Sequence, residues 1–160
     1  MIFLKKKKNK GFVILFAVTI SAMLLAIALG ISNIALKQMN FSTSAKNTGD
    51  AFFSADTGAE CALYNDKSTG TSFLQSAGSG NVSCMGRTIS LSGSSPSWSF
   101  IISGLGYSGQ GCAVVSVVKD FNASPVTTTI ISKGYNNGGS VLNNCTQSAT
   151  SVERELNLSY

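Results

Sequence analysis

The first long pattern along the chain is an unbroken apolar run near the amino terminus. Residues 12–31 read FVILFAVTISAMLLAIALGI, in which Thr19 and Ser21 are the only polar interruptions and no residue is charged. Apolar positions continue as far as Leu36. A helix of about 20 apolar residues can cross the roughly 30 Å hydrocarbon core of a bilayer. The pattern therefore predicts a membrane-spanning helix over residues 12–36.

Small residues recur at helical spacing further along the chain. They are four, three and four positions apart, so they share one helix face: Ala51, Ala55, Gly58 and Ala62. Two interpretations of this face are open, packing on the protein's own sheet and contact within a filament, and a long helix can make both on different faces. One helix over residues 12–64 would be about 75–80 Å long at 1.5 Å per residue. Gly30, Asn33 and residues 40–50 are places where it could bend.

Residues 65–160 show shorter alternating segments instead. The segments predicted as strands are 87–91, 98–103, 113–119, 127–135 and 152–160. The turn Asn122–Pro125 predicts an antiparallel hairpin between the third and fourth of them. In the last one, five alternate residues predict a buried face: Val152, Arg154, Leu156, Leu158 and Tyr160. Together the patterns predict an α+β protein, with a long amino-terminal helix packed against a small antiparallel sheet.

Charge is concentrated at one end of the chain. The 160 residues carry a formal net charge of +5, and five of the twelve cations lie within residues 5–10. The remainder is neutral, which argues against a nucleic-acid partner. A lysine cluster ahead of an apolar helix keeps residues 1–11 in the cytoplasm and exports the rest. We therefore expect a single-pass membrane protein whose head lies outside the cytoplasm.

Few residues carry catalytic chemistry. The sequence lacks histidine, which removes the usual general base and most catalytic zinc sites. No two cysteines form a Cys-x-x-Cys pair. Asp56 and Glu60 share a helix face without a third ligand, and Gly104–Gly109 has GxGxxG spacing without a βαβ unit, so we interpret them as a solvated face and a loop. We expect no enzyme activity, no metal and no cofactor.

The junction between the lysines and the apolar run is Gly11-Phe12. This arrangement resembles the type IV pilins, the pseudopilins and their minor-pilin relatives, and the stretch AFFSADTGAECALY resembles the helix end of PilX-type minor pilins. The resemblance implies cleavage after Gly11 by a prepilin peptidase and methylation of the new amino terminus at Phe12. Two other interpretations stay open: a secretory signal peptide cleaved near residues 26–28, and an uncleaved signal anchor.

One position departs from the resemblance. Major pilins of this kind carry a glutamate at the fifth residue after the cleavage site, where this chain has Phe16. The departure implies a minor, initiating or tip subunit of a filament used in motility, adhesion, DNA uptake or secretion. Its partners would be the bilayer, other pilin subunits and the assembly machinery. The filament and membrane contacts would come from residues such as Phe16, Leu24, Leu25 and Ile31.

These inferences divide the chain into a basic leader (1–11), a long helix (12–64) and a globular head (65–160). An exported head predicts disulfides among the four cysteines. Because the hairpin brings the loop 136–151 back to Cys112, we expect Cys112–Cys145 and Cys61–Cys84. Cys61–Cys145 with Cys84–Cys112, or Cys61–Cys112 with Cys84–Cys145, remain the alternatives. Each bridge would stabilise the fold by roughly 3–4 kcal/mol.

A second functional hypothesis belongs to a different class of protein. A signal-anchored surface protein could bind carbohydrate or another cell through its Ser/Thr-rich head. Three aromatic residues could line such a surface, although we expect them to pack in the core or the hairpin: Trp98, Tyr107 and Tyr135. The amino terminus of the mature protein distinguishes this hypothesis from the pilin hypothesis.

Overall fold

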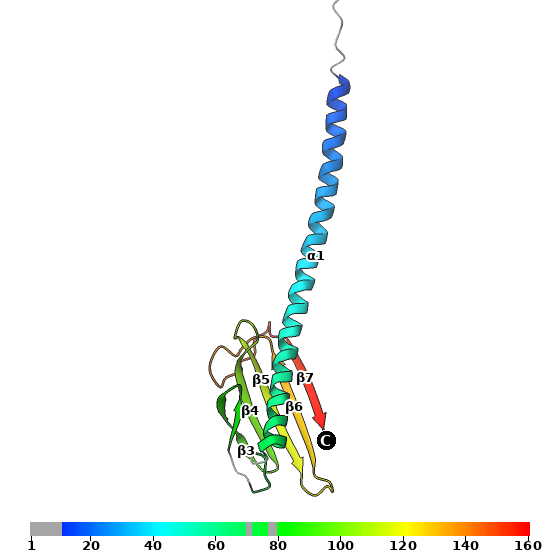
Figure 1. Cartoon of the computed structure of the whole chain (residues 1–160). Helices are drawn as coiled ribbons and strands as arrows, with labels where there is room; N and C mark the ends of the chain where they lie inside the picture. Colours follow the sequence, from blue (N-terminus) through cyan, green and yellow to red (C-terminus); the bar gives the residue numbers. More distant parts are fainter. Residues whose placement is uncertain (1–10, 70–71, 77–79) are drawn as a thin grey trace, which may run out of the picture. The chain divides into compact units, whose positions relative to one another are not determined.

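A computed structural model describes residues 11–69, 72–76 and 80–160 of the chain. Its contacts divide the chain into two compact units, which meet between Thr43 and Ser44. The helix α1 (Gly11–Tyr64) belongs to both units and confirms the predicted long helix (Figure 1). Of the predicted leader, residues 1–10 lie outside the described residues. By this division residues 44–64 of the helix, nearly six turns, belong to the same unit as the head.

The first unit consists of the helical residues 11–43. From Phe12 onward every side chain in this unit is exposed. Helical structure is continuous through Gly30 and Asn33. The Thr19 and Ser21 hydroxyls each donate a hydrogen bond of 2.9 Å to a backbone carbonyl one turn earlier. These two polar groups are therefore satisfied inside the helix, as an apolar environment requires.

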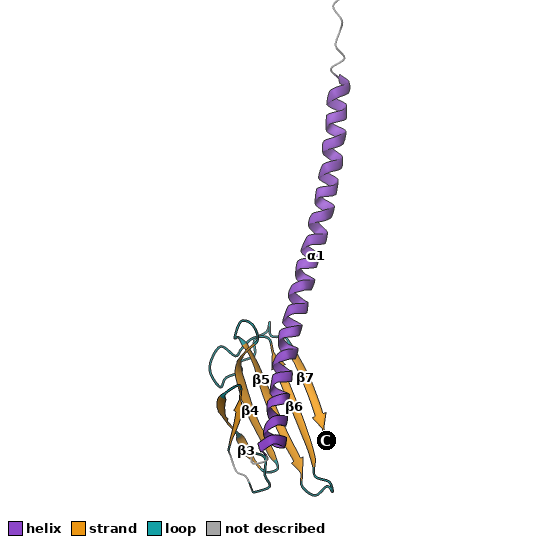
Figure 2. Ribbon diagram, in the orientation of Figure 1, coloured by secondary structure: helices purple, strands orange, loops and turns teal. Residues whose placement is uncertain are grey.

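The described residues of the second unit form the rest of α1, a short π-helical segment η1 (Asn65–Thr69) and seven strands. Five strands form an antiparallel sheet in the order β3-β4-β5-β6-β7 (Figure 2). In the described residues β1 pairs with β2 in a separate hairpin. The strand bounds are β1 (Asn81–Cys84), β2 (Arg87–Ser90), β3 (Ser92–Ser94), β4 (Ser97–Leu105), β5 (Gly111–Asp120), β6 (Thr127–Tyr135) and β7 (Glu153–Ser159). The α+β fold class is thus confirmed.

The stripe of small residues on α1 faces the protein's own sheet. Ala51, Ala55 and Ala62 are fully buried, and the Ser132 hydroxyl of β6 donates a hydrogen bond of 2.7 Å to the Ala55 carbonyl. A Cβ atom on Gly134 would lie 2.1 Å from the Ala55 amide nitrogen. Helix and sheet therefore approach backbone to backbone. The packing interpretation of the stripe is correct.

The larger core residues lie beside this close contact, towards the side of the sheet formed by β3 and β4. Trp98 and Phe100 of β4 lie on the inner face with Val117 of β5 and Ile130 of β6, all almost completely buried. The Phe73 ring stands edge-on to Trp98 with ring centroids 5.6 Å apart. The hairpin β1–β2 closes this core through Val82, Ile89 and the following Leu91. Cys61 and Ala62 near the end of α1 belong to the same core cluster.

The last strand is less buried than its alternation predicts. Leu156 and Leu158 are half-buried, but Arg154 is exposed and Tyr160 retains 37% of its surface. The reason is topological, because β7 is the edge of the sheet and pairs only with β6. Charged side chains along such an edge disfavour pairing with another chain. The predicted face is therefore confirmed in part: Val152, Leu156 and Leu158 are half-buried, whereas Arg154 and Tyr160 are exposed.

Candidate functional site

The first candidate site is the exposed apolar surface of α1 in the first unit. A window of 18 residues reaches a mean hydropathy of 2.8, and none of its surface is buried within the protein. This helix is long and apolar enough to cross a membrane. The residues predicted to make filament or membrane contacts are all exposed, by 58% to 64% of their surface: Phe16, Leu24, Leu25 and Ile31.

This surface can interact with its surroundings only through apolar contacts. No residue from Phe12 to Leu36 carries a charge, so the segment offers no titratable group and no ion pair. Burying a large aliphatic or aromatic side chain completely is worth about 1.5–3 kcal/mol. Contiguous exposed apolar area on this scale marks contact with lipid or with other proteins. The arrangement is suited to dissolving in a bilayer or packing against other apolar helices.

The predicted processing residues lie at the start of the same helix. Gly11 is the first helical residue, and Phe12 follows with 75% of its surface exposed. Cleavage after Gly11 would leave the apolar run at the new amino terminus. Nothing in the described residues tests whether this cleavage occurs, so the processing role of both residues stays a prediction.

Two disulfides cross-link the head in the predicted pairing. Cys61 of α1 is bonded to Cys84 at the end of β1, with Cα atoms 5.7 Å apart. Cys112 of β5 is bonded to Cys145 in the loop before β7, with Cα atoms 5.6 Å apart. The predicted hairpin between β5 and β6 is present, and Cys112 pairs with Tyr135 at its open end. The two alternative connectivities do not occur.

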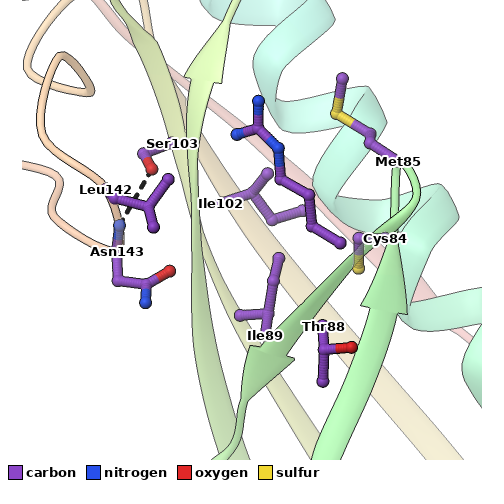
Figure 3. Close-up of a pocket in the computed structure, with 9 residues that line it drawn as sticks. Cys84, Met85, Thr88, Ile89, Ile102, Ser103, Leu142 and Asn143 are labelled. Carbon is purple, nitrogen blue, oxygen red and sulfur yellow. Dashed lines mark hydrogen bonds between the residues drawn. The ribbon is translucent and has the colours of Figure 1, made fainter.

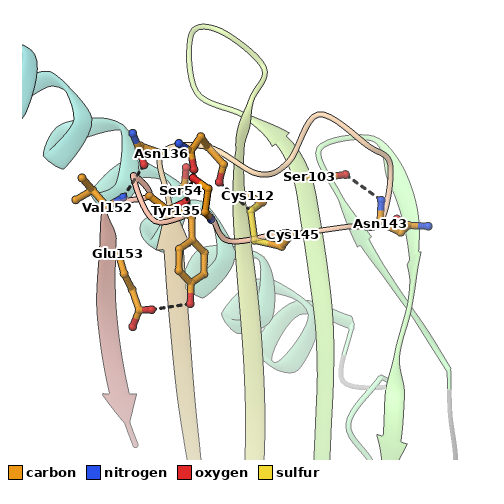
Figure 4. The surroundings of a disulfide bond; sticks show 12 residues. Ser54, Ser103, Cys112, Tyr135, Asn136, Asn143, Cys145, Val152 and Glu153 are labelled. Atoms are coloured by element: carbon orange, nitrogen blue, oxygen red, sulfur yellow. Dashed lines mark hydrogen bonds between the residues drawn. A yellow bond between two sulfur atoms is a disulfide. The ribbon is translucent and has the colours of Figure 1, made fainter.

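The loop carrying Cys145 is fixed to the end of the sheet by hydrogen bonds on both sides of the disulfide (Figure 4). The Asn136 side-chain oxygen accepts from the Val152 amide at 2.7 Å. The Asn143 amide donates to the Ser103 hydroxyl at 3.0 Å. These contacts hold residues 136–152 as a cap over the outer face of the sheet at this end.

A tyrosine–glutamate pair lies under the same loop. The Tyr135 hydroxyl donates a hydrogen bond of 2.7 Å to the Glu153 carboxylate. Burial, together with this bond to a carboxylate, raises the pKa of Tyr135 to about 12. The bond from Tyr135 in turn lowers the pKa of Glu153. Both side chains are therefore held in the protonation states that they have near neutral pH.

A further polar cluster, which the sequence analysis missed, ties the last residue to the end of the helix. Asp66 of η1 forms an ion pair with Lys119 of β5 and accepts a hydrogen bond of 2.8 Å from the Tyr160 hydroxyl. The Lys67 ammonium group lies 4.0 Å from the centroid of the Tyr160 ring. Asp66 is 53 positions from Lys119 and 94 positions from Tyr160, so no local spacing signals the cluster. Its satisfied contacts give it a structural role.

The other candidate residues are not brought together. Trp98 and Tyr135 are buried, whereas Tyr107 is 97% exposed in the loop between β4 and β5. Of the segment predicted as a loop, Gly104 and Leu105 are the end of β4, and Gly106–Gly109 lie in the connection to β5. Asp56 is half-buried and Glu60 is exposed. In the described part of the chain, no three residues of the metal-binding types come close enough to hold an ion.

Comparison of this chain with protein-family models, with curated proteins and with solved structures finds no match. The architecture of the chain is the feature that bears on its function. A long apolar amino-terminal helix whose carboxyl-terminal turns pack on an antiparallel sheet is a pilin-like architecture. Together with the two disulfides, it is consistent with a membrane-anchored protein.

Proposed function

We propose that this protein is a minor pilin or pseudopilin-like subunit of a type IV pilus or a related secretion or uptake filament. The observation that carries the proposal is the single helix α1. Its amino-terminal unit has no buried side chain among residues 12–43, and its last turns form the core of a disulfide-linked head. An anchor that served only to hold a protein in a bilayer would not need to continue as the central helix of the head.

The mechanism is assembly rather than catalysis. The apolar segment stores the subunit in the bilayer, with the lysine leader in the cytoplasm and the head outside. A prepilin peptidase removes the leader after Gly11, and the assembly machinery extracts the subunit from the membrane. Neighbouring helices then cover one another's apolar surfaces. Because helix–helix contacts replace helix–lipid contacts, this transfer costs little in hydrophobic free energy.

Phe16 supports a minor role within the filament. A carboxylate at this position would be expensive to bury unless a charge on a neighbouring subunit paired with it. Phe16 is apolar, and it provides no such specific contact between subunits. The chain would therefore join a filament through apolar packing alone, as an initiating, tip or occasional subunit beside a different major pilin.

The processing site provides the direct test of this function. Replacing Gly11 with leucine should block removal of the leader, because a peptidase that cuts beside a small residue cannot accommodate the larger side chain. The mature protein should begin at Phe12 in the unmodified chain and at Met1 in the Gly11→Leu variant. Mass spectrometry of the amino-terminal peptide measures both.

Ala28→Leu is the matched control, because it enlarges the small residue that a secretory signal peptidase would require. This variant should still mature at Phe12. Normal maturation of Gly11→Leu would contradict the proposal. An unmodified protein that begins at Met1 would identify a simple anchor, and one that begins near residue 29 would identify a secreted protein.

A further inference from the structure

Two loops lie at the end of the head where α1 enters it. The first helical residues of this unit, 44–54, lead to the end of β4 and the start of β5, because a Cβ atom on Gly111 would lie 2.8 Å from the Ser54 hydroxyl oxygen. The loop 106–110 between β4 and β5 and the loop 136–152 before β7 close the same end of the sheet (Figure 1). The chain therefore runs from its apolar segment directly into the end of the head that carries both loops.

Hydrogen bonds join the two loops to each other and to the sheet. The Gly104 amide at the end of β4 donates to the Gly139 carbonyl at 3.0 Å. The Asn143 amide donates to the Ser103 hydroxyl, which fixes the second loop to β4 (Figure 3). A disulfide holds the same loop to β5. The surface that the loops present is therefore formed before any partner arrives.

Three large side chains on these loops are not covered by the protein. Tyr107 is 97% exposed, Val141 60% and Leu142 69%. Leu142 borders a cavity of about 160 Å³, lined also by Ile102 and Arg87, and is still not buried. Several exposed apolar residues on loops that are joined to each other mark contact with a protein or a membrane. We call Tyr107, Val141 and Leu142 the loop surface.

The loops that carry the loop surface contain no charge. No residue between Arg87 and Lys119 is charged, and none is charged between Lys133 and Glu153. Glu153, the first acidic residue after the second loop, is bound to the Tyr135 hydroxyl and to Lys133. An uncharged apolar surface with an exposed tyrosine is suited to the membrane–water interface, where aromatic rings are enriched.

A short positive segment connects the apolar run to this end of the head. Leu36 ends the run and Ser44 begins the head unit, about 12 Å further along a helix. The headgroup layer outside the hydrocarbon core is about 5–8 Å thick, so the head begins about one helical turn beyond the lipid surface. Lys37 and Lys46 are the only charged residues in the sequence from 11 to 49. Lysines beside a membrane span place their ammonium groups among the lipid headgroups.

We propose that the loop surface rests on the bilayer while the subunit is stored in the membrane. The Tyr107 ring lies among the headgroups, and Val141 and Leu142 lie against the lipid. The bilayer is the favoured partner because α1 brings it to this end of the head and because the adjoining charges are positive. The inference rests on the membrane-inserted stage of the proposed function. The contact is a second attachment to the membrane, which extraction of the subunit would have to break.

The test uses the full chain in phospholipid nanodiscs, with protonated leucine and valine methyl groups in an otherwise deuterated protein. Nuclear Overhauser cross-peaks from lipid protons to a methyl group report direct contact. We expect such cross-peaks at Val141 and Leu142, as at Leu24 and Leu25 of the apolar run. Val126 is the internal control, because it is an exposed valine in the turn between β5 and β6, at the opposite end of the sheet. It should show none.

The same spectra separate this inference from the proposed function. Lipid contact at Leu24 without any at Val141 and Leu142 would overturn the inference and leave the membrane-inserted stage intact. Equal contact at Val126 and Val141 would also overturn it, because the head would then touch lipid without a preferred end. Cross-peaks at Val141 from a second, protonated copy of the chain in place of lipid would refute the bilayer as the partner. No lipid contact at Leu24 would contradict the membrane-inserted stage, and this inference with it.

A pair of tyrosine variants tests the side chain that is most exposed. Tyr107→Ser should reduce the lipid cross-peaks of Val141 and Leu142 at least about threefold and leave those of Leu24 unchanged. The matched control is Tyr64→Ser, which removes a ring that is 58% exposed at the end of α1 and should change none of them. Both rings are exposed, so both variants should fold. Equal effects of the two substitutions would contradict the contact.

Discussion

At the scale of single residues, the head depends on two glycines that let α1 approach the sheet. A Cβ atom on Gly58 would lie 2.4 Å from the Ser132 hydroxyl oxygen and 2.8 Å from a methyl carbon of Val115. On Gly134 it would lie 2.1 Å from the Ala55 nitrogen and 2.2 Å from the Ala51 carbonyl oxygen. Side chains can move to some extent, but the helix backbone cannot move without opening the interface. Gly134 is therefore the more restrictive position.

Gly134→Ala should destabilise the head by about 3 kcal/mol or more, at the upper end of what overpacking costs. The matched control is Gly49→Ala, which places the same methyl group on α1 where no atom lies within 4 Å. Because alanine favours a helix over glycine, the control should stabilise by roughly 0.5–1 kcal/mol. Urea denaturation of the oxidised protein in micelles measures both free energies. Equal stability of the two variants would contradict the backbone contact.

Tyr135 makes stability sensitive to alkaline pH. Its pKa is raised to about 12 from the ordinary value of 10.0, so the folded protein favours the neutral phenol. The stabilisation is complete below pH 10 and is lost as the pH rises towards 12. Tyr135→Phe removes the contribution of Tyr135, so the difference in unfolding free energy between the two proteins should shrink as the pH rises from 10 to about 12. A constant difference would contradict the assignment.

At the scale of elements, the helix and the strands were predictable where apolar residues form a regular pattern. The apolar run predicted α1, and alternation predicted β2, β4, β5, β6 and β7. β3 has the sequence Ser-Gly-Ser and β1 is only four residues long, so neither contains enough apolar positions to be recognised. The burial of β7 was overestimated because alternation does not reveal that a strand is at an edge.

The candidate sites also differ in how far the sequence could predict them. The Cys112–Cys145 disulfide was predictable because a hairpin fixes which strand ends meet, and Cys61–Cys84 followed as the remaining pair. The ion pair of Asp66 with Lys119 and the cavity beside Arg87 were not, since each joins residues from elements that only the tertiary fold brings together. The processing residues Gly11 and Phe12 rest on resemblance, and the fold does not test them.

Removing the disulfides one at a time should give similar losses of stability. Replacing both cysteines of a pair with serine avoids leaving a free thiol. In the chain-entropy description, separations of 23 and 33 residues correspond to roughly 3–4 kcal/mol each, with the longer loop favoured by a few tenths. Urea denaturation of the two double variants measures the losses. A loss near zero for either pair would show that its loop is held by other contacts.

At the scale of the whole molecule, the chain joins two units with opposite surface chemistry. The helical residues 12–43 bury nothing within the protein, whereas the head has an apolar core, two disulfides and a polar exterior. The first unit cannot remain exposed to water, because contiguous apolar area of this extent drives association or membrane insertion. Both a bilayer and a bundle of similar helices can cover this apolar surface. A subunit of the proposed filament would lie first in the bilayer and then in the bundle.

Quantitative mass spectrometry of filaments sheared from the cells that express this protein tests the central claim most directly. We predict that the sheared fraction contains this chain, beginning with a methylated Phe12, in far fewer copies than a second subunit that carries a glutamate near its own amino terminus. Finding the chain as the dominant subunit would contradict the minor role. Its complete absence from the filaments, with the intact lysine leader retained in the membrane fraction, would contradict the filament function itself.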